Sequence, residues 1–141
     1  MGYQCNRHNK SYNMKLRPTI WGTAMAGLAV VFGAFGAHAL KGKLEPEDVA
    51  VFQTGVQYQM YHALALILTG ILWKSKPSKS LGNAAVSFIL GIFMFSGSLY
   101  LITLSRLTNA DLRWIGPITP IGGIAFIVGW GLMVYHHISK R

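Results

Sequence analysis

The chain has 141 residues, of which 52% are hydrophobic and 12% charged, and its formal net charge is +9. Soluble domains carry roughly 25% charged residues, so this composition favours a membrane protein and leaves no room for a separate soluble domain that carries chemistry. The excess of Lys and Arg does not indicate nucleic-acid binding, because these residues are scattered between apolar stretches instead of forming one basic face. The single cysteine, Cys5, excludes an internal disulfide and a cysteine-based metal site.

A polar N-terminal tail precedes four apolar stretches. The tail, residues 1–13, has no apolar periodicity and is predicted to be disordered, with Met14 as an alternative start. The stretches cover residues 19–40, 52–73, 81–105 and 115–135, and none contains Asp, Glu, Lys or Arg. A helix of about 20 residues crosses about 30 Å of hydrocarbon, so each stretch is long enough to span a bilayer. Residues 14–141 are therefore predicted to form an all-α, integral-membrane four-helix bundle.

The first stretch is rich in glycine and alanine at a spacing of four, which lets membrane helices approach closely. It ends in Ala37-His38-Ala39, a pattern shared with cleaved signal peptides, but its apolar run is too long for such a signal. We therefore expect an uncleaved interior helix. The residues assigned to helix packing in this and later stretches are Gly22, Ala26, Gly33, Gly36, Gly97, Gly122 and Gly123.

The second stretch is predicted to begin its helix at Pro46, because proline suits the first helical turn and two acidic residues follow it. At about 100° per residue, Gln53, Gln57 and Tyr61 form one column of side chains. Tyr58 and His62 form the next column. We expect this polar side to face other helices or water and the opposite side to face lipid.

The third and fourth stretches carry isolated polar residues within apolar runs. Ser96, Ser98 and Tyr100 lie in the third stretch. In the fourth, Thr119 either caps the helix, with Pro120 at its first position, or belongs to an irregular segment buried against other helices.

Positive charges indicate the orientation of the four predicted spans. Lys and Arg are enriched in the cytoplasmic flanks of membrane proteins, and the segments that share a side with the two termini carry nine of the thirteen. The opposite side carries the other four together with all four acidic residues. Both termini are therefore predicted to be cytoplasmic. The nine are Arg7, Lys10, Lys15, Arg17, Lys74, Lys76, Lys79, Lys140 and Arg141.

With this orientation, the polar residues of all four spans fall in the outer half of the membrane. Their depths run from about 3 Å for His38 to about 15 Å for His62, at about 1.5 Å per residue. Polar groups in hydrocarbon seek partners, so we expect them to form either a structural hydrogen-bond network or a water-filled, ligand-binding pocket. The candidate cluster comprises His38, Gln57, Tyr58, His62, Ser96, Ser98, Tyr100 and Thr119.

Several kinds of chemistry have no support in the residues. His38 and His62 lack carboxylate or thiol partners, so no metal site is expected. No span carries Asp or Glu, and no phosphate-binding loop or paired carboxylates occur, so we expect neither an enzyme nor a cofactor. His136 and His137, at the predicted inner surface beside Lys140 and Arg141, are expected to be solvated or to meet anionic lipid heads.

Four motifs in order resemble a family of small bacterial membrane proteins, uncharacterised protein family 0382 or domain of unknown function 423, which is related to the transmembrane-protein-256-like family. The motifs are GAFGAHAL at 33–40, YQMYHALAL at 58–66, FSGSLY at 95–100, and GPITPIGG at 116–123 with a later GW at 129–130. The resemblance covers residues 14–141 and implies a four-helix integral plasma-membrane protein with no assigned activity. It supplies no catalytic or binding residue.

Two functions remain open at this point. One is a non-enzymatic component of the membrane that associates with itself or with a larger complex through its glycine- and alanine-rich helices. The alternative is a transporter or channel component whose outward-facing polar pocket binds a small solute. The expected partners are the lipid bilayer and another copy or a larger membrane complex, and not nucleic acid.

Overall fold

The computed structural model describes residues 17–108, 110 and 112–139, apart from the side chain of Arg113. Throughout this part of the chain the regular structure is helical, and the one β-type contact is an isolated bridge between Lys41 and Leu44. The predicted all-α class is therefore confirmed for the described residues. The predicted disordered tail, residues 1–13, and the alternative start at Met14 lie outside them.

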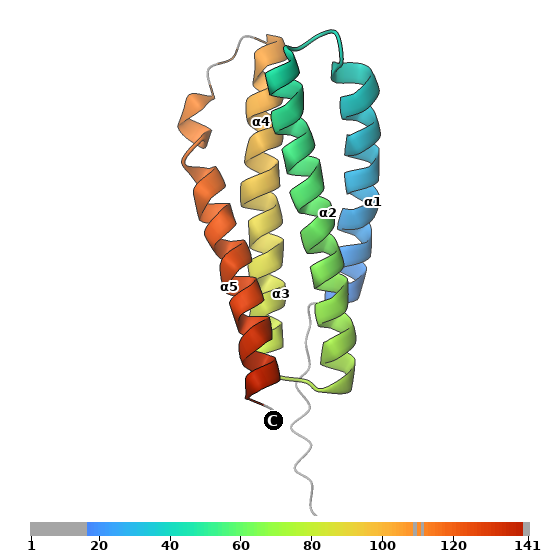
Figure 1. Cartoon of the computed structure of the whole chain (residues 1–141), viewed down its shortest axis with the longest axis vertical. Helices are drawn as coiled ribbons and strands as arrows, with labels where there is room; N and C mark the ends of the chain where they lie inside the picture. The colour runs from blue at the N-terminus through green and yellow to red at the C-terminus, as the bar shows by residue number, and fades with distance from the viewer. Residues whose placement is uncertain (1–16, 109, 111, 140–141) are drawn as a thin grey trace, which may run out of the picture.

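Four helical rods lie side by side (Figure 1). The first combines α1 (Pro18–Phe35) with a π-helical turn, η1 (Gly36–Leu40), and the second is α2 (Pro46–Ser75). The third rod combines α3 (Lys79–Gly91), the π-helical segment η2 (Ile92–Ser96) and α4 (Gly97–Ser105). Two 3-10 turns follow, η3 (Arg106–Thr108) and η4 (Arg113–Ile115), and α5 (Ile118–Ile138) forms the fourth rod.

Local signals explain where the helices begin. Proline occupies the first turn of both α1 and α2, where its missing N–H would be unbonded in any case. Ser78 caps α3 by accepting a hydrogen bond from the backbone N–H of Leu81 at 3.3 Å. The turn between the first two rods requires Gly42, whose φ of 85° is unfavourable for other residues.

The second and third rods occupy the middle of the molecule. α1 packs along α2, α2 packs against α3, η2 and α4, and α5 packs along α3 and η2. The largest apolar core lies where α2, α3 and α5 meet, and its fully buried members include Leu66, Leu81 and Phe88. Large apolar side chains also cover the outside, for example Ile127 at 72% exposed. An exterior of this kind suits lipid and not water.

Among the described residues, three helical segments are long and apolar enough to cross a membrane: Pro18–Leu40, Lys79–Thr108 and Ile118–Ile138. α2, which contains the predicted second span, is not one of them although it is 30 residues long. The reason is its composition, because three glutamines and a histidine between Gln53 and His62 lower the hydropathy of its first half.

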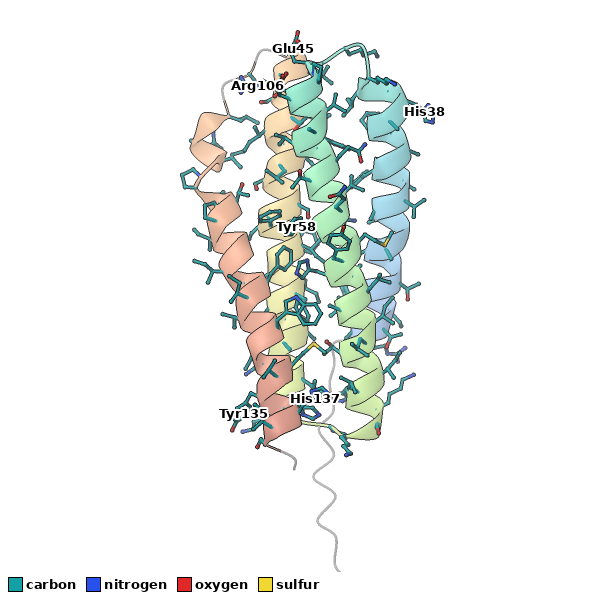
Figure 2. The ribbon with its side chains drawn as sticks, viewed as in Figure 1. His38, Glu45, Tyr58, Arg106, Tyr135 and His137 are labelled. Carbon is teal, nitrogen blue, oxygen red and sulfur yellow. The ribbon has the colours of Figure 1, made fainter. Side chains whose placement is uncertain are left out.

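Charges differ between the two ends of the rods. The start of α1, the connection from α2 to α3 and the end of α5 lie at one end (Figure 1), where the described charged residues are all basic. Glu45 and Arg106 lie at the opposite end (Figure 2). There, Arg106 Nε approaches Asp48 Oδ1 at 3.7 Å, which joins the end of α4 to the start of α2.

Candidate functional site

The residues of the predicted outer-leaflet cluster do not come together in one place. Two pairs are in contact, one residue bonds to a side chain outside the prediction, two residues are exposed, and one is buried without a hydrogen-bond partner. The pairs are Ser98 with Thr119 and Tyr58 with His62, and Tyr100 is the residue that bonds outside the prediction. His38 and Gln57 are the two exposed residues, and Ser96 is the buried one. His38 points away from the first rod at its end (Figure 2), far from the mid-rod position of Tyr58.

His62 lies among aromatic side chains where α2 meets α5. Its ring stacks on that of Phe126, with centroids 3.4 Å apart and planes 8° apart. Nδ1–H donates to the backbone oxygen of Tyr58 at 2.8 Å, and Nε2 accepts a hydrogen bond from the Trp130 indole at 3.3 Å. A histidine that donates at one nitrogen and accepts at the other is neutral. Both nitrogens are engaged within the chain, which favours a packing role over a metal ligand.

Further aromatic contacts extend this group to the third rod. Tyr58 stacks on Phe95 of η2 with ring centroids 4.6 Å apart, and Phe88 of α3 meets Trp130 edge-on at 5.4 Å. Such pairs contribute about 0.5–1.5 kcal/mol each beyond the burial of their surface. The aromatic group therefore fastens α2, the third rod and α5 together at mid-height and fills the space between them.

Gln59 joins three rods and was not among the predicted site residues. Its side-chain NH₂ donates to the backbone oxygen of Met25 on α1 at 2.8 Å, and its Oε1 accepts from the Tyr100 hydroxyl at 2.9 Å. Gly55 makes the second bond possible, because a Cβ at this position would lie 2.8 Å from Tyr100 Cε1. The side chain is only 3% exposed, so both bonds form away from lipid and water.

The position of Gln59 relative to other residues of α2 indicates that it belongs to the buried face of the helix. The buried positions of α2 recur at intervals of three and four, the interval that keeps one helix face turned toward its neighbours. Gly55 and Leu66 lie on the same face, and they indicate where other helices approach. The buried series is Phe52, Gly55, Gln59, His62, Leu66 and Thr69.

The contact between Ser98 and Thr119 joins the third rod to the first turn of α5. Ser98 donates its single hydroxyl proton to the backbone oxygen of Phe95 at 2.9 Å. Thr119 must then donate to Ser98 Oγ, at 2.6 Å. The prediction that Thr119 caps the helix was wrong, because α5 begins at Ile118. Of the predicted irregular entry, Gly116 and Pro117 form a turn, and Thr119 already lies in the helix.

Ser96 lies in the π-helical segment η2. It is fully buried, and its hydroxyl is the buried side-chain group without a hydrogen-bond partner in the described part of the chain. Such π-helical turns inside α-helices were not predictable from composition, because they replace i→i+4 backbone hydrogen bonds by i→i+5 bonds without requiring particular side chains.

The glycines predicted to pack helices divide into close contacts and open positions. A Cβ at Gly22 would lie 2.7 Å from the Ala63 carbonyl oxygen, and one at Gly36 would lie 2.8 Å from Phe52 Cδ1, so both hold α1 and η1 against α2. Gly122 abuts the backbone of η2. Looser positions are Gly33, with Val56 at 3.4 Å, Gly123, with Phe95 at 3.8 Å, Ala26, which is half-buried, and Gly97, which has no neighbour within 4 Å.

Two glycines that were not among the predicted packing residues interlock α3 with α5. Gly91 of α3 accommodates the ring of Phe126, and Gly129 of α5 accommodates Phe88, with a Cβ at Gly129 placed 2.6 Å from Phe88 Cε1. Each helix thus offers a glycine to a phenylalanine of the other. Because Phe126 also stacks on His62, the glycine contacts set the position of the aromatic group.

His136 differs from the expectation that it is solvated or meets lipid heads. It is 4% exposed, and its Nδ1 lies 2.8 Å from the Ser78 hydroxyl at the start of α3. Beside it is a surface hollow of about 170 Å³ whose lining includes Lys79 and Tyr135. His137, in contrast, is exposed and donates from Nδ1 to the backbone oxygen of Met133 at 2.8 Å. Tyr135 and His137 lie at the end of the rods opposite Glu45 (Figure 2).

The outward face of α2 carries the polar residues that the interior does not use. Gln57 and Tyr61 are exposed, so of the two surroundings expected for their column, other helices or water, the other helices of this chain do not cover them. The face of α2 that packs against the other rods carries Gln59 and His62, because these side chains form hydrogen bonds with residues of α1, α4 and α5. A helix rotated to bury Gln57 would expose both of them.

Comparison with known proteins identifies relatives along most of the chain. Residues 32–123 match the family model described as a protein of unknown function, DUF423. The UPF0382 membrane protein YwdK of Bacillus subtilis is 43% identical over 116 residues, covering 82% of this chain and 90% of that protein. A UPF0382 membrane protein of Staphylococcus haemolyticus is 41% identical over 115 residues, covering 82% of this chain and 89% of its own.

A more distant relative is the UPF0382 inner membrane protein YgdD of Escherichia coli K12. It is 37% identical over 112 residues, covering 79% of this chain and 82% of that protein. No solved structure matches the chain.

Proposed function

Because this chain belongs to the UPF0382 (DUF423) family of membrane proteins, we propose that it is a non-enzymatic, four-span component of the plasma membrane that acts by associating with other membrane-embedded chains. Its relatives are named as membrane and inner membrane proteins, and those names state no enzymatic activity. The location in the membrane is the premise for interpreting every exposed side chain below.

α2 serves as the fourth span in this proposal. Its 30 residues make a helix of about 45 Å, longer than the roughly 30 Å of hydrocarbon. It packs along the first and third rods and contacts α5 through the ring of His62, so it lies at the same depth as the three segments that meet the length and hydropathy expected of spans. The two polar side chains that it buries most deeply among the other rods, Gln59 and His62, are bonded within the chain, which lowers the cost of placing them in a membrane.

Both termini lie in the cytoplasm in this proposal. The end of the molecule that carries the start of α1 and the connection from α2 to α3 presents Arg17, Lys74, Lys76 and Lys79, and cytoplasmic flanks are rich in such residues. Alkaline phosphatase fused after Arg141 should be inactive, and a fluorescent protein fused there should fluoresce. An active phosphatase fusion contradicts this orientation.

One observation carries the association function. The interior polar groups His62, Gln59 and Ser98 are bonded within the chain, whereas Gln57 and Tyr61 face outward from the middle helix. A hydrocarbon environment gives an amide or hydroxyl no partner, so a surface of this kind is suited to contact with another protein. The solute-transport alternative has less support, because Gln57 is exposed and His38 points away from the other residues with which it would line a pocket (Figure 2).

The mass of the purified protein tests this function. The full chain, extracted in mild detergent, should form a particle whose protein mass exceeds the 15.5 kDa of one chain, measured by light scattering after correction for detergent. A homogeneous particle of one chain, with no second protein present after gentle extraction, overturns the association function.

A further inference from the structure

Gln57 lies on the outward face of α2 and makes no hydrogen bond within its own helix. Thr54, one turn earlier, donates its hydroxyl to the backbone oxygen of Ala50 at 3.0 Å. Exposed Thr23 on α1 bonds in the same way to Thr19 at 2.8 Å. The Gln57 amide, with two N–H donors and one oxygen, has no hydrogen-bond partner among the described residues.

The depth of Gln57 makes its exposure costly. It lies about 16 Å along α2 from Pro46, and sharing the excess length of the helix between its ends places it about 9 Å inside the hydrocarbon. Tyr61, 57% exposed on the next turn, lies near 15 Å. Water does not reach these depths to bond the amide. Exposed Asn83, by contrast, lies one turn from the start of α3, within reach of the membrane surface.

A second copy of the chain supplies what the amide lacks. Two copies inserted in the same direction are related by a two-fold axis along the membrane normal, and residues on that axis face their own equivalents at equal depth. Because a primary amide both donates and accepts, two Gln57 side chains satisfy one another. An acyl chain of a lipid offers neither a donor nor an acceptor.

The shape of the surface also suits a helix of the same kind. Exposed residues of α2 recur at alternating intervals of three and four, the interval at which two helices pack along one seam. A polar residue at one position of such a seam fixes the register of the two helices. The seam consists of Thr54, Gln57, Tyr61, Leu64, Leu68 and Ile71.

We propose that this outward face of α2, centred on Gln57, is a two-fold interface with a second copy of this chain. This inference rests on the proposed association function and identifies the associating chain as a second copy of the same protein. Polar side chains meet in the outer half of the interface and apolar side chains in the inner half.

Disulfide cross-linking in native membranes tests the interface. Cys5 is the single cysteine, so Cys5→Ser gives a background without thiols. In that background, oxidation with copper phenanthroline should link the Gln57→Cys and Leu64→Cys variants into dimers. Ile127→Cys, at 72% exposed on α5 and at comparable depth, should remain monomeric. A monomeric Leu64→Cys variant, which keeps the Gln57 amide, or equal cross-linking of Ile127→Cys, overturns the interface.

Replacing the amide tests its role without a new cysteine. Gln57→Leu should weaken dimerisation about tenfold, as measured by energy transfer between labelled copies in liposomes. Gln57→Asn, which keeps the amide, should retain most of the affinity, and Thr23→Val on the exposed face of α1 should match the wild type. Equal dimerisation of Gln57→Leu and the wild type overturns the proposal.

The outcomes separate this inference from the function on which it rests. A chain that purifies with a different membrane protein but never with itself overturns the second copy and leaves the association function in place. A dimer that forms normally when Gln57 is leucine overturns the α2 interface alone. A solitary chain without companions overturns both.

Discussion

One methyl group added at Gly122 should push α5 away from the third rod, whereas the same group at Gly123 should not. A Cβ on Gly122 would lie 2.8 Å from Phe95 Cβ and 2.9 Å from the carbonyl carbon of Met94. These neighbours belong to the backbone of η2 or are fixed to it, so they cannot rotate aside. A Cβ on Gly123 would meet nothing closer than Phe95 Cδ2 at 3.8 Å, an ordinary contact distance.

The two substitutions should therefore have different effects on the free energy of unfolding. Forcing one extra carbon into a packed interface costs about 1–3 kcal/mol. Separating the rods also weakens the bond between Ser98 and Thr119, which contributes about 0.6 kcal/mol on the scale of membrane helices. Exchanging glycine for alanine in an unobstructed helix gains about 0.5–1 kcal/mol. Gly122→Ala should lower the free energy of unfolding by about 1–3 kcal/mol. Gly123→Ala should leave it unchanged or raise it by up to about 1 kcal/mol.

Unfolding in mixed micelles measures this difference. The two variants and the wild type, reconstituted in dodecylmaltoside, are titrated with dodecyl sulfate while tryptophan fluorescence and circular dichroism are followed. The midpoint for Gly122→Ala should fall and that for Gly123→Ala should stay or rise. Equal midpoints for the two variants refute the close approach of α5 to η2.

Three further changes address other contacts of the described chain, each measured by the same titration. Gln59→Leu should lower the free energy of unfolding by about 1–2 kcal/mol, because it removes both hydrogen bonds that join α2 to α1 and α4. An unchanged midpoint would show that these two bonds do not stabilise the fold. Trp130→Phe should lose up to about 2 kcal/mol, since it leaves the buried Nε2 of His62 without a donor. Gly91→Ala should destabilise the protein by about 1–3 kcal/mol through the Phe126 ring, and Gly97→Ala, in open space on the same rod, should not.

The positions of the four rods were predictable because the signals for them are local. Runs without charged residues mark the rods, and Pro46 marks the start of α2 as expected. The π-helical segments were not predictable, since a local change from i→i+4 to i→i+5 backbone hydrogen bonds leaves no trace in composition. The all-helical class and the membrane family thus follow from the sequence, whereas the local geometry around Ser96 requires coordinates.

The packing glycines show why adjacent, identical residues need a structure to distinguish them. Gly122 and Gly123 have the same sequence environment, yet only the first abuts another backbone. Gly97 belongs to a small-residue run and touches nothing across the interface. Close approach depends on the direction in which each Cα points and on what lies opposite, and the partner helix is distant in sequence.

Gln57 and Gln59, two of the three glutamines of α2, show that polar residues are equally hard to assign from the sequence. Gln57 and Gln59 are two positions apart, so they point to nearly opposite sides of the helix at about 100° per residue. Hydropathy weighs them equally, and assigning the larger polar column to the interior placed Gln57 inside. The interior instead holds Gln59, because the Met25 carbonyl and the Tyr100 hydroxyl lie where its amide can bond to both. Among the described residues, one chain therefore satisfies only one of these two amides, and in the proposed dimer a second copy satisfies the other.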